Sequence, residues 1–432
     1  MRKLSEAVFY QLALRNFTDE GTLDAAAQQL AFIAAAGMDY IYLSPVAQAD
    51  TDADRSHWSQ RALNSHCDNE KNPYRISNYF AIDEEYGGEG ALRRFVQEAH
   101  RLGMGVLLDL VYYHCGPHCS LAREHQEYFC HLPDGSIDPG QFNMLVFDYA
   151  QPGLRRYMTD NMLYLLREFD VDGFRCDCGD WIPADFWEDA VQEARAVKPD
   201  MVMLNEGHEA SHLRQAFQMD YGVFLAEPLR ALLLDHTTDV AAIRKTLQAA
   251  SVRYEPGRWG VCGIENHDIA NDAYDQRVEM VLPPGAMEAA AVLCFTMGGV
   301  PFVYNGLEIA DARRHSIFHN RTHGTGMGVD WHCAETEKGR ARYRLIQQLT
   351  DLRHRCIALQ QGQTVFHDGG GESILHFDRA MENECVSIWV NLSARDAIVR
   401  APNYRGETLL CCGARRENEI IHLESFGYLI AR

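Results

Sequence analysis

The chain has 432 residues, of which 47% are hydrophobic and 10% aromatic, enough apolar material for a large core and more than one domain. Lys and Arg total 40 against 61 for Asp and Glu, so the formal net charge is −21. This negative balance argues against a nucleic acid or an anionic membrane as a partner, and it suits a neutral ligand.

The N-terminal segment MRKLSEAVFYQLALRNF lacks the apolar core and the cleavage site of a secretory signal. No run elsewhere approaches the roughly 20 apolar residues that span a bilayer. The thirteen cysteines are an odd number, and Cys176, Cys262 and Cys294 lie in apolar segments where free thiols behave as small hydrophobic side chains. We therefore expect a cytoplasmic protein.

Eight β-like runs follow one another along the chain, separated by stretches with helical spacing, such as 23–36 before Gly37 and 92–99 before Gly103. Strands that alternate with helices favour parallel βα units, and eight such units match a (β/α)8 TIM barrel. The runs are AVFYQL near position 7, DYIYLSP near 39, GVLLDLV near 105, DGFRCD near 172, MVMLNE near 201, DYGVFL near 220, GVCGIEN near 260 and VPFVYN near 300.

Two connections, 44–105 and 115–148, are too long for a regular barrel. After about Arg353 the chain changes to short alternating strands typical of an antiparallel sheet, with the Gly-rich segment 368–373 as a hairpin loop. We therefore predict an α/β fold in three parts: a (β/α)8 barrel over 1–114 and 149–353, a small inserted subdomain after strand 3 over 115–148, and a C-terminal antiparallel β-sandwich domain over 354–432.

Four of the apolar runs end in polar residues, in the segments VLLDLVYYH, GFRCD, MLNE and IENHD. Burying an unpaired carboxylate is costly, whereas the carboxyl ends of barrel strands share one cleft where functional side chains gather. Singly, Arg175 with Asp177 could be a structural ion pair and the histidines could be core residues. Together the strand ends predict one site, which contains Asp109, His114, Arg175, Asp177, Glu206, His267 and Asp268.

The order of these segments resembles the sequence blocks of the α-amylase family of glycoside hydrolases. The resemblance rests on FYQLALRNFTD, on NPYRISNYFAIDEEYGGEGALRRFVQEAHRLGMGVLLDLVYYH, and on the later GFRCD, NE, ENHD and GGVPFVYNGLEIA. It covers nearly the whole chain. A single block would be weak evidence, but the ordered set is specific.

The resemblance implies that Asp177 is the nucleophile and Glu206 the general acid, and then the base, of a retaining glycosidase. Such enzymes need two carboxyl groups roughly 5–5.5 Å apart, and these two residues end adjacent predicted strands. We expect Arg175 to favour the ionised form of Asp177, and we expect a raised pKa for Glu206 when the cleft is occupied. Asp268 is implied to bind the hydroxyls of the distorted sugar and to stabilise an oxocarbenium-like transition state.

The remaining site residues are implied to bind and position the substrate. His114 and His267 would donate hydrogen bonds to the same sugar ring, and Asp109 would orient Arg175. Tyr74, in the segment NPYRISNY, matches the family's stacking tyrosine beneath the sugar, although an ordinary packing role stays open for it.

Two departures from the family pattern concern a metal ion and the leaving group. The family's first block usually ends Asn-His, with the Asn a calcium ligand, whereas here Tyr113 precedes His114 and the loop FTDEGTLD lacks a full calcium-binding series. We therefore predict no cofactor and no calcium requirement. Endo-acting members often carry Lys-His after the nucleophile, whereas this chain has Asp180 and Trp181 in that region, so its acceptor side is altered.

Two further points stay open. Trp181, Phe186 and Trp187 could form a stacking wall, or the helix that follows the strand could bury some of them. The segment HCGPHC could supply zinc ligands, but its spacing matches no standard pattern, and we predict a reduced, thiol-rich subdomain without a metal. Its candidate ligands are Cys115, His118, Cys119, Cys130 and His131.

The resemblance implies a retaining α-glycosidase that hydrolyses α-glucosidic bonds in maltooligosaccharides or related α-glucans. A transglycosidase is the alternative, since it uses the same residues, and a non-catalytic carbohydrate-binding barrel is a third hypothesis that predicts missing carboxylates. The expected partner is an oligosaccharide or α-glucan, with neither nucleic acid nor membrane. Linkage preference, endo or exo attack and oligomeric state stay open.

Overall fold

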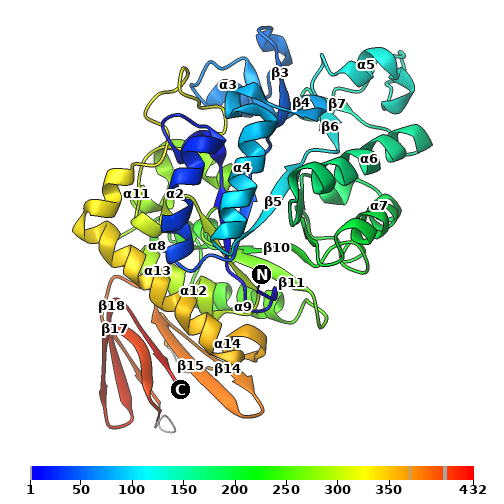
Figure 1. The fold of residues 1–432 in the computed structure, drawn as a ribbon. Helices are drawn as coiled ribbons and strands as arrows, with labels where there is room; N and C mark the ends of the chain where they lie inside the picture. The colour runs from blue at the N-terminus through cyan, green and yellow to red at the C-terminus, as the bar shows by residue number, and fades with distance from the viewer. Residues whose placement is uncertain (1, 369–370, 402–405) are drawn as a thin grey trace.

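The computed structural model describes residues 2–368, 371–401 and 406–432, and its centre is a closed barrel of eight parallel strands (Figure 1). Each predicted β-like run forms one of these strands, so the predicted barrel is confirmed. In their order around the barrel the strands are β1 (Phe9–Leu12), β2 (Tyr40–Leu43), β5 (Gly105–Leu110), β8 (Gly173–Cys176), β9 (Val202–Asn205), β10 (Met219–Phe224), β11 (Trp259–Gly263) and β12 (Val300–Tyr304), which pairs with β1.

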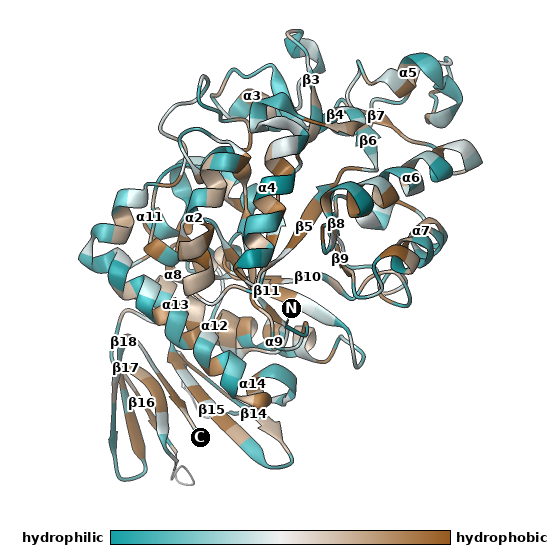
Figure 2. Cartoon of the chain, in the orientation of Figure 1, coloured by the Kyte–Doolittle hydropathy of each residue, from teal (hydrophilic) through white to brown (hydrophobic). Residues whose placement is uncertain are grey.

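The barrel strands are buried almost throughout, because side chains of the other strands cover them inside and helices cover them outside. Inside, Phe9, Tyr42 and Leu204 belong to one apolar cluster. Outside, the strands share a larger core with the surrounding helices. Figure 2 shows the contrast between the hydrophobic strands β5, β8 and β9 and the hydrophilic outer faces of the helices.

The structure has a helix at each of the two stretches, 23–36 and 92–99, where the sequence predicts one. α2 (Leu23–Ala35) is capped by Thr22, whose side chain accepts a hydrogen bond from the Ala25 backbone, and Gly37 follows it with φ of 89°. The other long helices are α4 (Gly88–Arg101), α6 (Pro152–Phe169), α7 (Ala184–Val197), α8 (Ala226–Leu233), α9 (Val240–Ser251), α12 (Ala286–Thr296) and α13 (Glu337–Arg355).

No single helix in the described ranges is both long and apolar enough to cross a membrane. Residues 267–281 together with α12 meet the length and composition criterion, but the two parts are bent by 109°. Every residue of α12 except Glu288 is buried, and the helix packs against β11, α13 and the C-terminal sheet. Core packing therefore accounts for its apolar sequence.

The two long connections lie at the same end of the barrel, in the upper part of Figure 1. The first contains the antiparallel pair β3 (Ala47–Thr51) and β4 (Lys71–Ile82), with α3 (Gln60–Asn64) between them. The second contains the short pair β6 (His114–Cys115) and β7 (Leu145–Val146), with α5 (Ser120–Glu124) between them. The two connections follow the carboxyl ends of β2 and β5, so they form walls above that end of the barrel.

The C-terminal region is an antiparallel β domain, as predicted. Its strands form one continuous sheet rather than two separate sheets, because β18 pairs with β15, β16 and β17 and so joins both halves. Of the predicted hairpin loop 368–373, residues 369 and 370 lie outside the described ranges. The strands are β13 (Gln363–Phe366), β14 (Ile374–Met381), β15 (Glu384–Asn391), β16 (Ala397–Arg400), β17 (Thr408–Glu417) and β18 (Ile420–Ala431).

Candidate active site

A cavity of about 520 Å³ opens at the carboxyl ends of the barrel strands, below the two long connections. This volume is within the usual range for small-molecule sites. Its lining residues are Ser59, Gln60, Arg61, Asn72, Tyr74, His114, Gln141, Phe142, Met144, Asp177, Cys178, Asp180, Trp181, Glu206, Gly207, Asp268, Ile317 and Phe318.

The eight predicted site residues gather here in two layers. The first layer lines the cavity and contains Tyr74, His114, Asp177, Glu206 and Asp268. The second layer is buried directly behind the first and contains Asp109, Arg175 and His267.

Arg175 is fully buried at the centre of the second layer and joins the carboxylates of three strands. Its Nη1 donates to both carboxylate oxygens of Asp109, at 2.7 and 2.9 Å, and to Oδ1 of Asp177 at 2.9 Å. Its Nη2 lies 2.7 Å from Oε1 of Glu206. The register explains this arrangement, since Asp109 pairs with Arg175 across β5 and β8. The predicted contact between Asp109 and Arg175 is therefore present.

Asp177 and Glu206 follow the adjacent strands β8 and β9, and one carboxylate oxygen of each lies within 4.8 Å of the other. The backbone N–H of Cys178 donates to Oε2 of Glu206 at 2.8 Å, which fixes the orientation of that carboxyl. Two carboxyl groups at this spacing can act from the two sides of one bond.

Burial raises the pKa of Asp177 well above its ordinary value, and the negative charge of Glu206 raises it further. Arg175 lowers the pKa of Asp177, as expected, but burial and Glu206 outweigh it, so the net shift of the pKa is upward. Two buried carboxylates at this distance do not ionise together readily, so the pair retains a proton to higher pH than a solvated pair would.

Tyr74 lines the cavity and also closes off His267 from it. The Tyr74 hydroxyl donates to Oδ2 of Asp109 at 3.0 Å and lies 2.6 Å from Nε2 of His267, and the two rings stack at 5.6 Å. The other ring nitrogen of His267 contacts Gln11. His267, predicted to contact the sugar, therefore has both nitrogens engaged by the protein in this structure.

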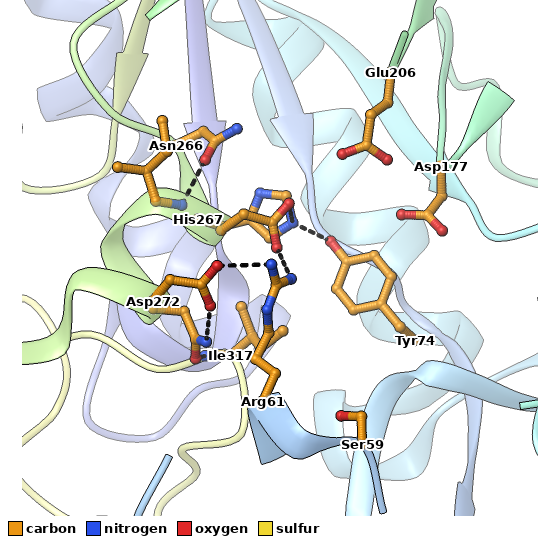
Figure 3. A network of polar contacts seen from close by, with 12 residues as sticks. Ser59, Arg61, Tyr74, Asp177, Glu206, Asn266, His267, Asp272 and Ile317 are labelled. Atoms are coloured by element: carbon orange, nitrogen blue, oxygen red, sulfur yellow. Dashed lines mark hydrogen bonds and ion pairs between the residues drawn. The ribbon is translucent and has the colours of Figure 1, made fainter. Parts of the chain in front are cut away.

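Asp268 lies in the first turn of α10 (His267–Ala273), a helix capped by the side chain of Asn266. Its Oδ1 accepts a hydrogen bond of 2.5 Å from Nη1 of Arg61, whose Nη2 donates to Asp272 at 2.8 Å (Figure 3). Burial opposes ionisation of Asp268, but the neighbouring positive charges, with Arg61 in direct contact, lower its pKa.

Arg61 and Asp272 are site residues that the sequence patterns do not reveal. Arg61 lies on α3, inside the long connection between β2 and β5, and no motif marks it. The one local signal is Ser59, which caps α3 by accepting a hydrogen bond from the Ala62 backbone and so sets the direction of the helix.

Asp180 supports the loop that carries Glu206. One oxygen accepts from the Asn205 side chain at 2.7 Å, and the other accepts from the backbone N–H groups of His208 and Glu209 at 2.6 and 3.1 Å. A Cβ at Gly207 would overlap this carboxylate, so any larger residue there requires Asp180 or the loop to shift. Asp180, which lies in the region where endo-acting family members often carry Lys-His, therefore holds this loop in place.

An aromatic surface borders the cavity beyond Cys178. Trp181 is 48% exposed, its ring stacks on Phe142 at 5.9 Å, and Tyr113 meets its edge at 4.9 Å. Phe186 and Trp187 lie on the buried face of α7. The open question about the stacking wall is thus answered: Trp181 faces the cavity, whereas the other two belong to the core.

His114 completes the wall on the side of the inserted segment. It is 3% exposed, its ring lies 5.6 Å from Phe142, and burial lowers its pKa to about 4. The imidazole is therefore neutral at neutral pH and can donate one hydrogen bond and accept another.

Two groups of side chains in the described ranges could bring three metal-ligating atoms together. One is Asp177, Cys178 and Glu206 in the site, and the other is His367, His376 and Asp378 on the C-terminal domain. In the segment HCGPHC, for which a metal-free subdomain was predicted, Cys115 and Cys119 are buried, whereas His118 points to Asp50, with its Nδ1 3.0 Å from the carboxylate.

Residues 10–142 match the family model described as "Alpha amylase, catalytic domain". The chain is 28% identical over 355 residues to malto-oligosyltrehalose trehalohydrolase of Rhizobium sp. (strain M-11), covering 71% of this chain and 55% of that protein. It is 25% identical over 452 residues to cyclomaltodextrinase of Geobacillus thermopakistaniensis, covering 95% of this chain and 70% of that protein. The solved α-amylase of Lactobacillus plantarum superposes with a TM-score of 0.83 at 22% identity, covering 99% of both chains.

The structure thus combines a closed parallel barrel with paired carboxylates at the ends of adjacent strands, an arrangement that barrel glycosidases also have. Residues 10–142 therefore match the catalytic-domain model of the α-amylase family of glycoside hydrolases, and the relatives and the solved structure named above are similar to the chain over most of its length. It spans about half the length of the first relative named above.

Proposed function

We propose that the protein is a retaining α-glycosidase that hydrolyses α-glucosidic bonds in maltooligosaccharides or related α-glucans. The observation that carries this proposal is the pair Asp177 and Glu206, with carboxylate oxygens within 4.8 Å in one cavity. Retaining enzymes separate their carboxyl groups by about 5–5.5 Å, whereas inverting enzymes need about 6.5–9.5 Å for a water. The names of the relatives, malto-oligosyltrehalose trehalohydrolase and cyclomaltodextrinase, support an α-glucan substrate.

In the proposed mechanism Asp177 attacks the anomeric carbon while Glu206 gives its proton to the glycosidic oxygen, and the leaving sugar departs. Glu206, now a carboxylate, takes a proton from water, whose oxygen attacks the anomeric carbon and releases Asp177. Asp268 accepts hydrogen bonds from the sugar hydroxyls, and Arg175 offsets the negative charge of Asp177 as the carboxylate re-forms. Calcium has no role in this scheme.

A transglycosidase remains the second candidate, because an acceptor sugar can replace water in the second step. The observation that favours it is the exposed Trp181, which stacks on Phe142 beside the cavity. Such a surface can hold the apolar face of a second sugar.

The test is to incubate the protein with maltooligosaccharides, pullulan, isomaltose and sucrose, with and without an added acceptor sugar, and to resolve the products. Glu206→Gln and Asp177→Asn should each abolish turnover, and NMR of the first product should show the α-anomer. Transfer products with the acceptor would favour the transglycosidase. Turnover that survives in Asp177→Asn would contradict the role of Asp177 as the nucleophile. No turnover of any of these substrates would contradict the proposal and leave a binding role.

We also propose a cytoplasmic location. The supporting observation is that all thirteen cysteines are free thiols in the structure, including the exposed Cys385, Cys411 and Cys412. Exposed thiols persist in a reducing compartment.

A further inference from the structure

Arg61 joins two elements on opposite sides of the cavity mouth. It extends from α3, in the first long connection, to Asp268 and Asp272 on α10. In Figure 3 the Tyr74–His267 hydrogen bond lies between its guanidinium and the carboxyl of Glu206. Arg61 is therefore at the side of the site away from the general acid.

The chemistry of the proposed function defines which end of the substrate lies on that side. The general acid protonates the departing oxygen, so the leaving sugar lies toward Glu206 and the adjacent Trp181. The sugar attacked by Asp177 lies toward Asp268. Any further sugar on its non-reducing side would have to extend past Asp268, where Arg61 stands.

The contacts of Arg61 suit it to recognise a chain end. Two carboxylates hold the guanidinium, yet the side chain is 40% exposed and lines the cavity. A guanidinium has five N–H donors, more than these two contacts use, so it can donate to the hydroxyl oxygens of a terminal sugar.

We propose that Arg61 closes the donor side of the site and makes it a pocket for the non-reducing end of a glucan, so that the protein cleaves from chain ends. This inference rests on the proposed function. Arg61 determines specificity, and Asp272 positions Arg61 from outside the cavity.

The test compares maltoheptaose with the same chain carrying a cyclic ethylidene acetal on its non-reducing glucose. Wild-type protein should cleave the free chain about 100-fold faster than the blocked chain, since the acetal has no room beside Arg61. Arg61→Ala should cleave the blocked chain at nearly the rate of the free one, and its products should include internal cleavage.

Two variants serve as comparisons. Asp272→Asn removes the charge of one carboxylate that holds Arg61. Its ratio of the cleavage rates of the free and the blocked chain should lie between those of the wild type and Arg61→Ala. Arg94→Ala breaks an exposed ion pair with Asp24 outside the barrel and should keep the wild-type ratio. Melting temperatures would show that each variant is folded.

The outcomes separate this inference from the proposed function. An active wild type that cleaves both chains equally, or an Arg61→Ala variant with the wild-type ratio, overturns the chain-end pocket and leaves the glycosidase proposal intact. If the wild type cleaves neither chain, nor pullulan, isomaltose or sucrose, the proposed function fails and this inference fails with it.

Discussion

Nη1 of Arg175 lies 2.9 Å from Oδ1 of Asp177 in the interior of the barrel, and the same nitrogen also holds Asp109. A lysine at position 175 would keep the positive charge but could not contact these carboxylates and Glu206 together. We expect Arg175→Lys to lower kcat about 10²–10³-fold with a smaller effect on KM.

The pH profile gives a second readout for the same variant. Arg175 lowers the pKa of Asp177 against the effects of burial and Glu206, so weakening its contact should raise that pKa further. The acid limb of kcat/KM should then move to higher pH, because Asp177 must be ionised to act as the proposed nucleophile. An unchanged profile in a folded variant would contradict the role of Arg175.

Gly207 and Asp180 give a prediction about the loop that holds Glu206. In Gly207→Ala the new Cβ would overlap the Asp180 carboxylate, so the loop must shift and activity should fall. Asp180→Ala should cost about 1–3 kcal/mol of stability, since it removes the acceptor of the buried Asn205 amide, whereas the exposed N–H groups of His208 and Glu209 can donate to water instead.

The double variant tests whether the two residues act on each other. With Asp180 already removed, Gly207→Ala should have little further effect on stability or kcat, which urea unfolding and kinetics would measure. If the losses of stability and kcat in the double variant equal the sum of the two single losses, the overlap with Asp180 does not cause the effect of Gly207→Ala.

The sequence predicts most of the fold because the positions of strands and of helix ends are both marked by local sequence patterns. Buried parallel strands are apolar runs, and helix ends carry Thr22 or Gly37 as markers. The single C-terminal sheet was not predictable, because it depends on β18 pairing along its length with three other strands. Such long-range pairings leave no local pattern.

The same distinction holds in the site. Asp177 and Glu206 were identifiable because they end apolar strands, and strand order then brings them together. Arg61 lies in an irregular connection, so its contact with Asp268, more than 200 positions later, depends on how that connection folds. The raised pKa of Asp177 likewise depends on burial, which Arg175 alone does not reveal.

Chelation should not affect activity. Tyr113 occupies the position of the family's calcium-ligating Asn, and its ring packs against Trp181 at 4.9 Å, so it supplies no amide oxygen there. We expect the same rate and melting temperature before and after treatment with EDTA. Loss of activity that calcium restores would show that the protein has a calcium site after all.

Acid should destabilise the C-terminal domain through His376, whose ring stacks on Trp389 at 4.6 Å and faces His367 and Asp378. Burial, with a further contribution from His367, lowers its pKa to about 4. The unfolded chain binds a proton near its ordinary pKa of about 6.5, so the stability that His376 contributes is present above that pH and is lost between about 6.5 and 4. Between pH 7 and 5 the loss should be about 2 kcal/mol.

His376→Phe keeps an aromatic ring on Trp389 but does not titrate. Urea unfolding at pH 7 and pH 5 should therefore show a smaller loss in this variant than in the wild type. The sign follows from proton binding: the unfolded wild-type chain binds more protons than the folded one in this window, so its stability must fall with pH. An equal loss in both proteins would place the acid sensitivity elsewhere, with the buried His114 as the next group to test.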